Sequence, residues 1–315
     1  MKALVTGIKG QDGFFLARHL IHSGYDVVGT SHENSSMFLV DDTIVPVHKL
    51  ELTDYGQVKD LITTVRPQFI FNLAARASSS QLFDDPIATA EINGVAVVRF
   101  LEAIRNTDPS IRFCQASSCE VFSGVTESPQ NENTRICPTN AYGAAKAFAD
   151  HAIAAYRASH NIFACSAILY PHESPRRNKH FLVRKVVSAA VAISKGTEKQ
   201  LVLGDLRTIR DWGWAPDYMS AMLKIAEHDI PMDFVLATGV GTSVMDVCET
   251  AFELVKLNWR SFLVQDISLK RGTDLVPKIG DASKAQTVLK WQPTVNFSDM
   301  IKILIDWELK ESNGM

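Results

Sequence analysis

Apolar and polar positions follow two different periods along the first half of the chain. Short, nearly continuous apolar runs indicate buried strands, and the stretches between them carry apolar residues at the spacing of amphipathic helices. The predicted strands cover residues 2–6, 26–30, 44–47, 69–75 and 111–116, and the predicted helices cover residues 14–21, 58–65, 90–104 and 142–156. Strands that alternate with helices predict an α/β fold with a doubly wound parallel sheet of the Rossmann type.

The pattern changes after residue 169. Residues 170–180 are polar, basic and interrupted by prolines, and loops of this kind commonly carry binding residues. Further helices and strands are predicted at residues 181–193, 200–203, 216–227, 234–239, 244–257 and 297–310. We therefore expect a smaller C-terminal domain beside the Rossmann domain.

The composition is that of a globular protein and narrows the classes of function. Hydrophobic residues make up 46% and charged residues 21% of the 315 residues, and the formal net charge is −3, which gives no electrostatic footprint for nucleic acid. No apolar run is long enough to span a membrane. The five cysteines form no Cys-x-x-Cys pair, so we expect reduced thiols, no metal site and an untargeted cytoplasmic protein.

Three glycines separate the first predicted strand from the first predicted helix. Gly7, Gly10 and Gly13 are spaced Gly-x-x-Gly-x-x-Gly. Glycines at such positions permit a tight turn and a close approach to a pyrophosphate, and the N-terminus of the helix favours phosphate. A purely structural turn is the alternative, but the position between strand and helix favours a dinucleotide site.

The ends of the next strands bear on which dinucleotide binds. An acid at the end of the second strand binds the ribose of NAD, whereas a basic residue tolerates the phosphate of NADP. Residues 30–36 read Thr-Ser-His-Glu-Asn-Ser-Ser, with no acid in the first positions and with His32 available. We therefore favour NADP, while Glu33 leaves NAD open. Glu51 could accept a hydrogen bond from the adenine amine, whereas Thr53 or Asp54 could equally cap the following helix.

Tyr142 and Lys146 lie at the start of the helix predicted at residues 142–156. Residues four apart share a helix face, and an ammonium beside a phenol lowers the pKa of the phenol, which would make Tyr142 a general base. Ser118 and Glu120 follow the strand at 111–116, at the sheet edge where ligands bind. We expect both to face one substrate; the alternatives are a chance pair on a partly buried helix and an ordinary Ser-rich turn.

Several arginines in the second half of the chain are candidate phosphate ligands, because a guanidinium fork matches the oxygens of a phosphate. They are Arg177, Arg184, Arg210 and Arg271. Taken singly, each is more often a surface charge.

Several motifs recur together, and in this order, in one known family. They are Gly7–Gly13 with Gln11 and Asp12, the Tyr142–Lys146 pair, His-Glu-Ser-Pro-Arg-Arg at 172–177, Arg-Asp-Trp-Gly at 210–213, Ala-Thr-Gly at 237–239, and the segments 280–285 and 291–293. Over nearly the whole chain they resemble the extended short-chain dehydrogenase/reductases, and among them the GDP-mannose 4,6-dehydratase family.

The resemblance implies a lyase that forms a 4-keto-6-deoxy sugar from GDP-mannose or a close relative. Tyr142, supported by Lys146, would take the proton of the hydroxyl at carbon 4, and a hydride would pass to NADP and return to carbon 6. Glu120 would remove the proton at carbon 5, and Ser118 would hydrogen-bond the substrate oxygen. The family also suggests a homodimer or homotetramer.

The resemblance further implies which residues contact each ligand. Cofactor contacts are expected from Gly7, Gly10, Gln11, Asp12, Gly13, His32, Glu51, Leu52, Leu73, Ala74, Ala75, Tyr142, Lys146, His172 and Arg177. Substrate contacts are expected from Ser78, Ser118, Glu120, Tyr142, Glu173, Lys185, Arg210 and Arg271. Residues 1–169 with 205–239 would form the dinucleotide-binding domain, and residues 170–204 with 240–315 the nucleotide-sugar-binding domain.

The chain departs from the family pattern at several places, among them the loop after Ser36 and the region around Trp259, which are shorter than in typical members. Pro171 replaces an asparagine, the arginine expected near His32 is absent, and Arg271 is followed by Gly-Thr-Asp instead of Pro-Thr/Ser-Glu. These changes affect the cofactor edge and the nucleotide-sugar site and leave the acid/base residues in place. A nucleotide-sugar reductase or epimerase of the same fold therefore remains an alternative, as does an NADP-binding protein without turnover.

Overall fold

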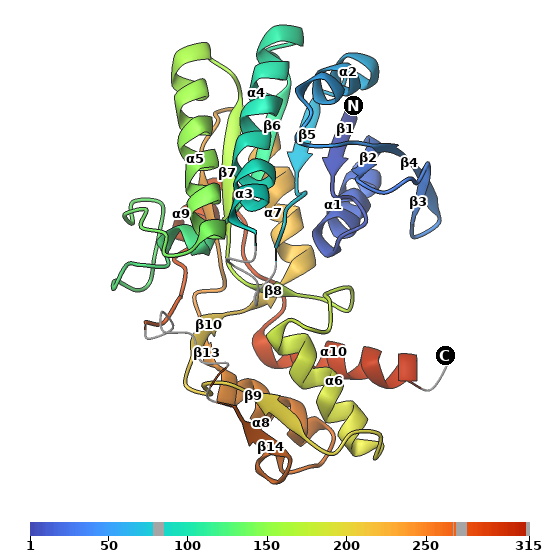
Figure 1. The fold of residues 1–315 in the computed structure, drawn as a ribbon, viewed down its shortest axis with the longest axis vertical. Coiled ribbons are helices and arrows are strands. Elements are labelled where there is room, and N and C mark those ends of the chain that lie inside the picture. Colours follow the sequence, from blue (N-terminus) through green and yellow to red (C-terminus); the bar gives the residue numbers. More distant parts are fainter. Residues whose placement is uncertain (78–84, 267, 269–275, 313–315) are drawn as a thin grey trace.

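The computed structural model describes residues 1–77, 85–266, 268 and 276–312. Ser78 and Arg271, both predicted to contact substrate, lie outside these residues. The described part contains one large sheet with helices on both faces and a smaller helical layer beyond one end of the sheet (Figure 1).

The large sheet has eight strands in the order β12-β7-β6-β5-β1-β2-β4-β3. Its strands are β1 (Lys2–Thr6), β2 (Asp26–Ser31), β3 (Met37–Val40), β4 (Thr43–Lys49), β5 (Phe69–Asn72), β6 (Arg112–Ser118), β7 (Ala164–Leu169) and β12 (Phe234–Leu236). All neighbouring strands are parallel except β3 and β4, which form an antiparallel hairpin at the edge. The doubly wound sheet is therefore confirmed.

The direction in which strands are added reverses between β1 and β5. The chain runs from β1 outward through β2 and β4, and then returns to place β5 on the other side of β1. Ligands of doubly wound sheets bind outside the carboxyl ends of the strands at such a reversal. Here those ends are Thr6 of β1 and Asn72 of β5, which are paired in register.

Two apolar clusters lie on the two faces of the sheet. One cluster includes residues of α1 (Gln11–His22), α7 (Ala215–Glu227) and α9 (Ser283–Leu289), and the other includes residues of α2 (Tyr55–Val65), α4 (Ala96–Thr107) and α5 (Ala141–His160). The helix predicted at 90–104 is α4, preceded by α3 (Pro86–Ala90) and the π-helical turn η1 (Glu91–Val95). Strand β3 was not predicted, although Met-Phe-Leu-Val is an apolar run.

A third apolar cluster fills the smaller layer. It includes residues of α6 (Leu182–Ser194), α8 (Val244–Leu254), α10 (Phe297–Ser312) and the 3-10 turn η3 (Trp259–Ser261), beside the parallel pair β9 (Leu201–Leu203) and β14 (Leu263–Gln265). Two short sheets, β8 (His172–Glu173) with β11 (Gly213–Trp214) and β10 (Ile209–Asp211) with β13 (Gly241–Ser243), lie between this layer and the large sheet (Figure 1). The assignment of ligands to two domains stays a prediction.

No helix within the described part of the chain combines the length and the apolar character that are needed to span a bilayer.

Candidate active site

A cavity of about 450 Å³ opens where the carboxyl ends of the parallel strands face the smaller layer. Twelve residues predicted from the sequence line it together: Asp12, Leu73, Ala75, Ser118, Glu120, Tyr142, Lys146, His172, Glu173, Arg177, Lys185 and Arg210. Gly7, Gly10, Gln11, Gly13, His32, Glu51, Leu52 and Ala74 are not among its lining residues. The described structure therefore brings the predicted acid/base residues and most of the predicted substrate contacts to one volume.

The glycine loop packs too closely for side chains. Gly7 has a φ of +65°, and a Cβ on this residue would lie 3.0 Å from the Cα of Ala74. A Cβ on Gly13 would lie 2.4 Å from the carbonyl oxygen of Gly7. Gly10 is the N-cap of α1 and has no side chain to cap the helix, so the first amides of α1 stay available to an anion. This cradle fits the pyrophosphate of a dinucleotide.

A buried polar network holds the carboxyl ends of β1, β5 and β6 together. The hydroxyl of Thr6 donates to Asn72 Oδ1 at 2.6 Å and accepts from the backbone N–H groups of Leu73 and Ala74, both at 3.0 Å. Asn72 Nδ2 donates to Gln115 Oε1 at 2.7 Å. The sequence analysis missed these residues, because a polar residue at a strand end gives no sign of its partner in another strand.

His172 connects the glycine loop with β8. Its Nε2 lies 3.0 Å from Asp12 Oδ1, and its Nδ1 lies 2.7 Å from the carbonyl oxygen of Tyr170. A carboxylate and a carbonyl only accept hydrogen bonds, so both ring nitrogens donate and the ring is an imidazolium. Burial works against both charges, yet His172 lowers the pKa of Asp12 to about 2, and Asp12 raises the pKa of His172.

Gln11 and Ser174 strengthen the same connection. Gln11 Nε2 donates to the carbonyl oxygen of His172 at 3.3 Å, and the hydroxyl of Ser174 donates to Gln11 Oε1 at 2.7 Å. The first turn of α1 is therefore fixed to the segment that follows β7. These contacts give Gln11, Asp12 and His172 a positioning role, and their direct contact with a cofactor stays a prediction.

A basic residue that was not predicted from the sequence lies between the glycine loop and the end of β2, where the cofactor is expected. Lys9, within the glycine loop, places its Nζ 2.8 Å from Glu33 Oε2 just after β2. His32 is exposed beside this pair.

Glu51 is also exposed and accepts hydrogen bonds from the backbone and hydroxyl of Thr53. Asp54 caps α2 by accepting from the backbone N–H of Gln57, which confirms the capping alternative for Asp54.

Tyr142 and Lys146 both line the cavity from the first turns of α5, as their spacing predicted. The expected effect of Lys146 on the phenol is wrong for this structure. Burial raises the pKa of Tyr142 well above its ordinary value, and a hydrogen bond with Ser118 opposes this rise. Lys146 Nζ instead donates to the carbonyl oxygen of Ala116 at 2.6 Å, and burial lowers the pKa of Lys146 to about 8.

Glu120 lies in the 3-10 turn η2 (Cys119–Phe122), directly after β6. Its Oε1 accepts from Lys278 Nζ at 2.9 Å, and its Oε2 accepts from Asn140 Nδ2 at 2.8 Å. Burial would raise the pKa of Glu120, but the charge of Lys278, the hydrogen bonds from Lys278 and Asn140, and Arg210 hold it below its ordinary value. The carboxylate is therefore ionised and able to accept a proton.

Glu173 presents a buried carboxylate to the same cavity. It is 2% exposed, and its Oε2 has no hydrogen-bond partner among the described residues. Arg177 Nε lies 3.9 Å from Glu173 Oε1, while the guanidinium of Arg177 lies 3.6 Å from the ring centroid of Phe181. Burial raises the pKa of Glu173 against the opposing charge of Arg177. Such a group is suited to accept a hydrogen bond from a ligand.

The remaining candidate cations differ in their placement. Lys185 Nζ donates to the carbonyl oxygen of Val202 at 2.7 Å, and Arg210 Nη1 donates to that of Ile209 at 2.8 Å. Arg184 is buried, does not line the cavity, and pairs with Glu308 at 3.0 Å. Arg184 is therefore not placed to bind a phosphate in this cavity, because its guanidinium lies inside the smaller layer beside Glu308.

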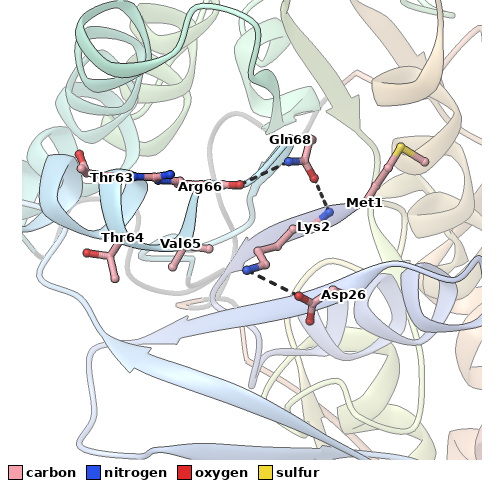
Figure 2. A pocket seen from close by; sticks show the side chains of 8 residues that line it. All are labelled: Met1, Lys2, Asp26, Thr63, Thr64, Val65, Arg66 and Gln68. Atoms are coloured by element: carbon pink, nitrogen blue, oxygen red, sulfur yellow. Dashed lines mark hydrogen bonds and ion pairs between the residues drawn. The ribbon is translucent and has the colours of Figure 1, made fainter.

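A second, open pocket lies at the opposite end of the sheet (Figure 2). It includes Lys2 and Asp26 at the first residues of β1 and β2, and Arg66 and Gln68 between α2 and β5. Lys2 and Asp26 form an ion pair of 3.7 Å.

Among the described residues no group of three or more His, Cys, Asp or Glu side chains is arranged to hold a metal ion. The cavity at the carboxyl ends is therefore the candidate active site.

Comparisons with known proteins agree over nearly the whole chain. The family model described as GDP-mannose 4,6 dehydratase matches residues 4–304. GDP-mannose 4,6 dehydratase 2 of Arabidopsis thaliana is 35% identical over 98% of this chain and 87% of its own length. Among solved structures, UDP-glucose 4-epimerase with UDP-glucose from Thermotoga maritima has a TM-score of 0.87 at 22% identity, covering 99% of this chain and 100% of that chain. The structure of RMD from Pseudomonas aeruginosa complexed with NADPH has a TM-score of 0.83 at 21% identity, covering 98% and 99% of the two chains.

Proposed function

The chain belongs to the GDP-mannose 4,6-dehydratase family, and from this premise we propose that it is a lyase acting on a nucleotide-diphosphate sugar. The proposed substrate is GDP-mannose or a close relative, and the proposed product is the 4-keto-6-deoxy sugar. The observation that carries the proposal is that Tyr142, Ser118 and the ionised Glu120 line one cavity. Proton transfers at two different carbons require two groups of different pKa, and a phenol and a carboxylate provide them.

We infer that the cofactor is NADP. The cradle around Gly7, Gly10 and Gly13 would hold its pyrophosphate, and next to the end of β2 the phosphate of NADP would compete with Glu33 for the charge of Lys9. The Pseudomonas neighbour, which shares the fold, is complexed with NADPH. When bound, a nicotinamide cofactor supplies a hydride acceptor for carbon 4 and a hydride donor for carbon 6. NAD is the alternative that the cofactor comparison below tests.

Tyr142 is the proposed acceptor of the proton from the hydroxyl at carbon 4. Burial raises the pKa of Tyr142, and the hydrogen bond from Ser118 is the contact that most favours the phenolate. Lys146 Nζ lies 5.7 Å from the centroid of the Tyr142 ring. Glu120 would accept the proton of carbon 5, which a ketone at carbon 4 makes acidic, and water would then leave from carbon 6.

The substrate would be held from the opposite wall of the cavity. Glu173 offers a carboxylate oxygen without a partner among the described residues, and Lys185 and Arg210 contribute positive charge for the diphosphate. Ser78 and Arg271 are proposed for the same substrate. We propose that residues 170–204 and 240–315, apart from α9, which packs on the large sheet, form the nucleotide-sugar-binding domain, and that the protein assembles as a homodimer or homotetramer.

The proposal is tested with purified protein and a panel of nucleotide sugars, each with a catalytic amount of NADP or of NAD. We expect GDP-mannose or a close relative to give a product lighter by one water, measured by mass spectrometry, and NADP to support more turnovers than NAD. The Tyr142→Phe variant is the control, since it removes the phenolic oxygen and should abolish product formation.

Three outcomes would contradict the lyase. Oxidation of NADPH in proportion to the conversion of a 4-keto sugar would indicate a reductase, and isomerisation without loss of water would indicate an epimerase. Tight nucleotide binding without product from any sugar of the panel would indicate a binding protein.

A further inference from the structure

Lys278 is buried next to the candidate base although it lies far from Glu120 in the sequence. The lysine is 6% exposed. Its backbone N–H donates to the carbonyl oxygen of Ile209 at 3.3 Å, and its carbonyl oxygen accepts from the N–H of Asp211 at 3.0 Å. These bonds form a parallel bridge between Lys278 and Arg210. Both the N–H and the carbonyl group of Lys278 are therefore hydrogen-bonded to β10, which fixes its backbone.

The side chain of Lys278 completes the set of donors around Glu120. Its Nζ lies 2.9 Å from Glu120 Oε1, and Asn140 Nδ2 lies 2.8 Å from Glu120 Oε2. Asn140 is itself fixed, because its Oδ1 accepts from the backbone N–H of Gly143 at the start of α5. Both carboxylate oxygens are thus held by donors that have fixed backbones. The plane of the carboxylate cannot rotate without breaking one of these contacts.

If no cation lay nearby, the buried environment of Glu120 would favour the neutral carboxylic acid. Burial acts against the charged carboxylate, and Lys278 is the first among the groups that oppose this effect. Arg210 contributes in the same direction. A neutral carboxylic acid cannot accept a proton, so the state of Glu120 decides whether it can act as a base.

We propose that Lys278 is a positioning residue for the acid/base step, because its ammonium keeps Glu120 ionised and oriented toward the cavity. This inference rests on the proposed function of Glu120. The charge of Lys278 also acts on the step that follows: once Glu120 has accepted a proton, the attraction between the two side chains is lost. The proton taken from carbon 5 is therefore readily passed to the hydroxyl that leaves carbon 6 as water, and Glu120 is ionised again.

The test compares the pH dependence of kcat/KM in the parent protein and in Lys278→Met, which keeps the length of the side chain and removes its charge. An opposite charge at this distance lowers the pKa of a carboxyl by about 1–3 units. We expect the acidic limb of the profile to move to higher pH by about the same amount in Lys278→Met. Lys278→Arg should restore the limb to its original position. Lys284→Met is the matched control, because Lys284 donates to the carbonyl oxygen of Asp233 and lies on α9.

A loss of activity at every pH, with an unmoved acidic limb, would overturn the proposal and leave Lys278 a structural role. Lys278→Gln serves as a second uncharged variant if Lys278→Met does not fold, as judged by circular dichroism. The same limb position in Lys278→Gln and in the parent would overturn the proposal as well.

A second measurement decides the matter without turnover. Carbon-13 labelling of glutamate carboxyl groups allows NMR titration, and the signal that disappears in Glu120→Gln is that of Glu120. We expect this signal to titrate below the ordinary range of glutamate in the parent and at higher pH in Lys278→Met. Equal titration in both proteins would refute the role of Lys278. If no nucleotide sugar is dehydrated, the proposed function fails, whereas this titration still decides whether Lys278 controls the ionisation of Glu120.

Discussion

Two opposing influences act on the carboxyl group of Glu120. Burial favours its neutral form, whereas Lys278 and Asn140 favour its charged form, and the charged form is the more stable. Tyr142 shows the contrary balance, since burial outweighs the hydrogen bond from Ser118 and the phenol stays protonated. The two groups therefore carry different charges on one cavity wall. Their separate protonation states suit separate proton transfers.

Replacement of Glu120 should separate the two proton transfers. Glu120→Gln keeps the size of the side chain and its contact with Asn140, but it removes the group that accepts the proton of carbon 5. We expect hydride exchange at carbon 4 to continue while the elimination of water falls by about 10²- to 10⁴-fold. Isotope exchange into the substrate, followed by mass spectrometry, measures both steps. An equal loss of both steps would remove Glu120 from its assigned role.

At the level of elements, the segment that connects β6 with α5 determines the geometry of the site, because it carries both Glu120 and Asn140. Asn140 caps α5 through its side-chain oxygen and holds Glu120 through its side-chain nitrogen. One amide therefore connects the start of the helix that carries Tyr142 and Lys146 with the turn that carries Glu120. The relative positions of phenol and carboxylate depend on this connection.

Asn140→Ala should weaken both the helix and the base. Loss of an N-cap costs about 1 kcal/mol of unfolding free energy, and Glu120 Oε2 would lose its donor. We expect a lower urea midpoint together with a reduced kcat. Asp54→Ala is the control, because it removes the cap of α2 at a residue that does not line the cavity, and it should lower stability by a comparable amount while kcat is kept. Equal effects of the two variants on kcat would contradict the link between Asn140 and Glu120.

Across the whole molecule, the ion pair between Asp12 and His172 connects the glycine loop of the large sheet with the segment that leads into the smaller layer. Asp12 lies in the first turn of α1 and His172 in β8. His172 is buried, and the carboxylate is three-quarters covered. A pair with so little exposure is screened weakly by salt. Its ionisation should therefore influence the stability of the whole fold.

The pH dependence of unfolding should reveal this pair. The pKa of Asp12 falls from 3.8 to about 2 on folding, so its contribution is complete above about pH 4 and is lost as the pH falls toward 2. The pKa of His172 rises above 6.5, so its contribution is complete below about pH 6.5 and is lost as the pH rises through the folded-state pKa. The shift of Asp12 corresponds to about 2 kcal/mol of unfolding free energy.

Urea unfolding of the parent and of His172→Gln, from about pH 3 to about pH 9, measures this dependence. We expect the difference in unfolding free energy to be largest near pH 5 and to shrink toward both ends of the range. A difference that is constant with pH would mean that packing, and not the ion pair, accounts for the effect of the substitution.

Local sequence patterns predicted the sheet and most helices, because these depend on neighbours in the chain. The spacing of Tyr142 and Lys146, and the position of Glu120 after a strand, were sufficient to bring them to one edge. Lys278 could not be predicted as a partner of Glu120, because the contact joins residues 158 positions apart. The direction of the pKa shift of Tyr142 was wrong for a related reason: burial arises from the fold, and spacing along a helix does not reveal it.

All the residues proposed for proton transfer lie in one supersecondary unit, and this has a consequence for how substrate selectivity can change. Ser118, Glu120, Tyr142 and Lys146 all come from β6, η2 and α5, whereas Glu173, Lys185 and Arg210 reach the cavity from other segments. Under the proposed function, substitutions among the residues from other segments can therefore alter which sugar is recognised, while the residues proposed for proton transfer stay unchanged. Pro171 also lines the cavity from outside that unit, so we expect the departure from the family at this residue to change substrate selectivity and to leave the proposed proton transfers unchanged.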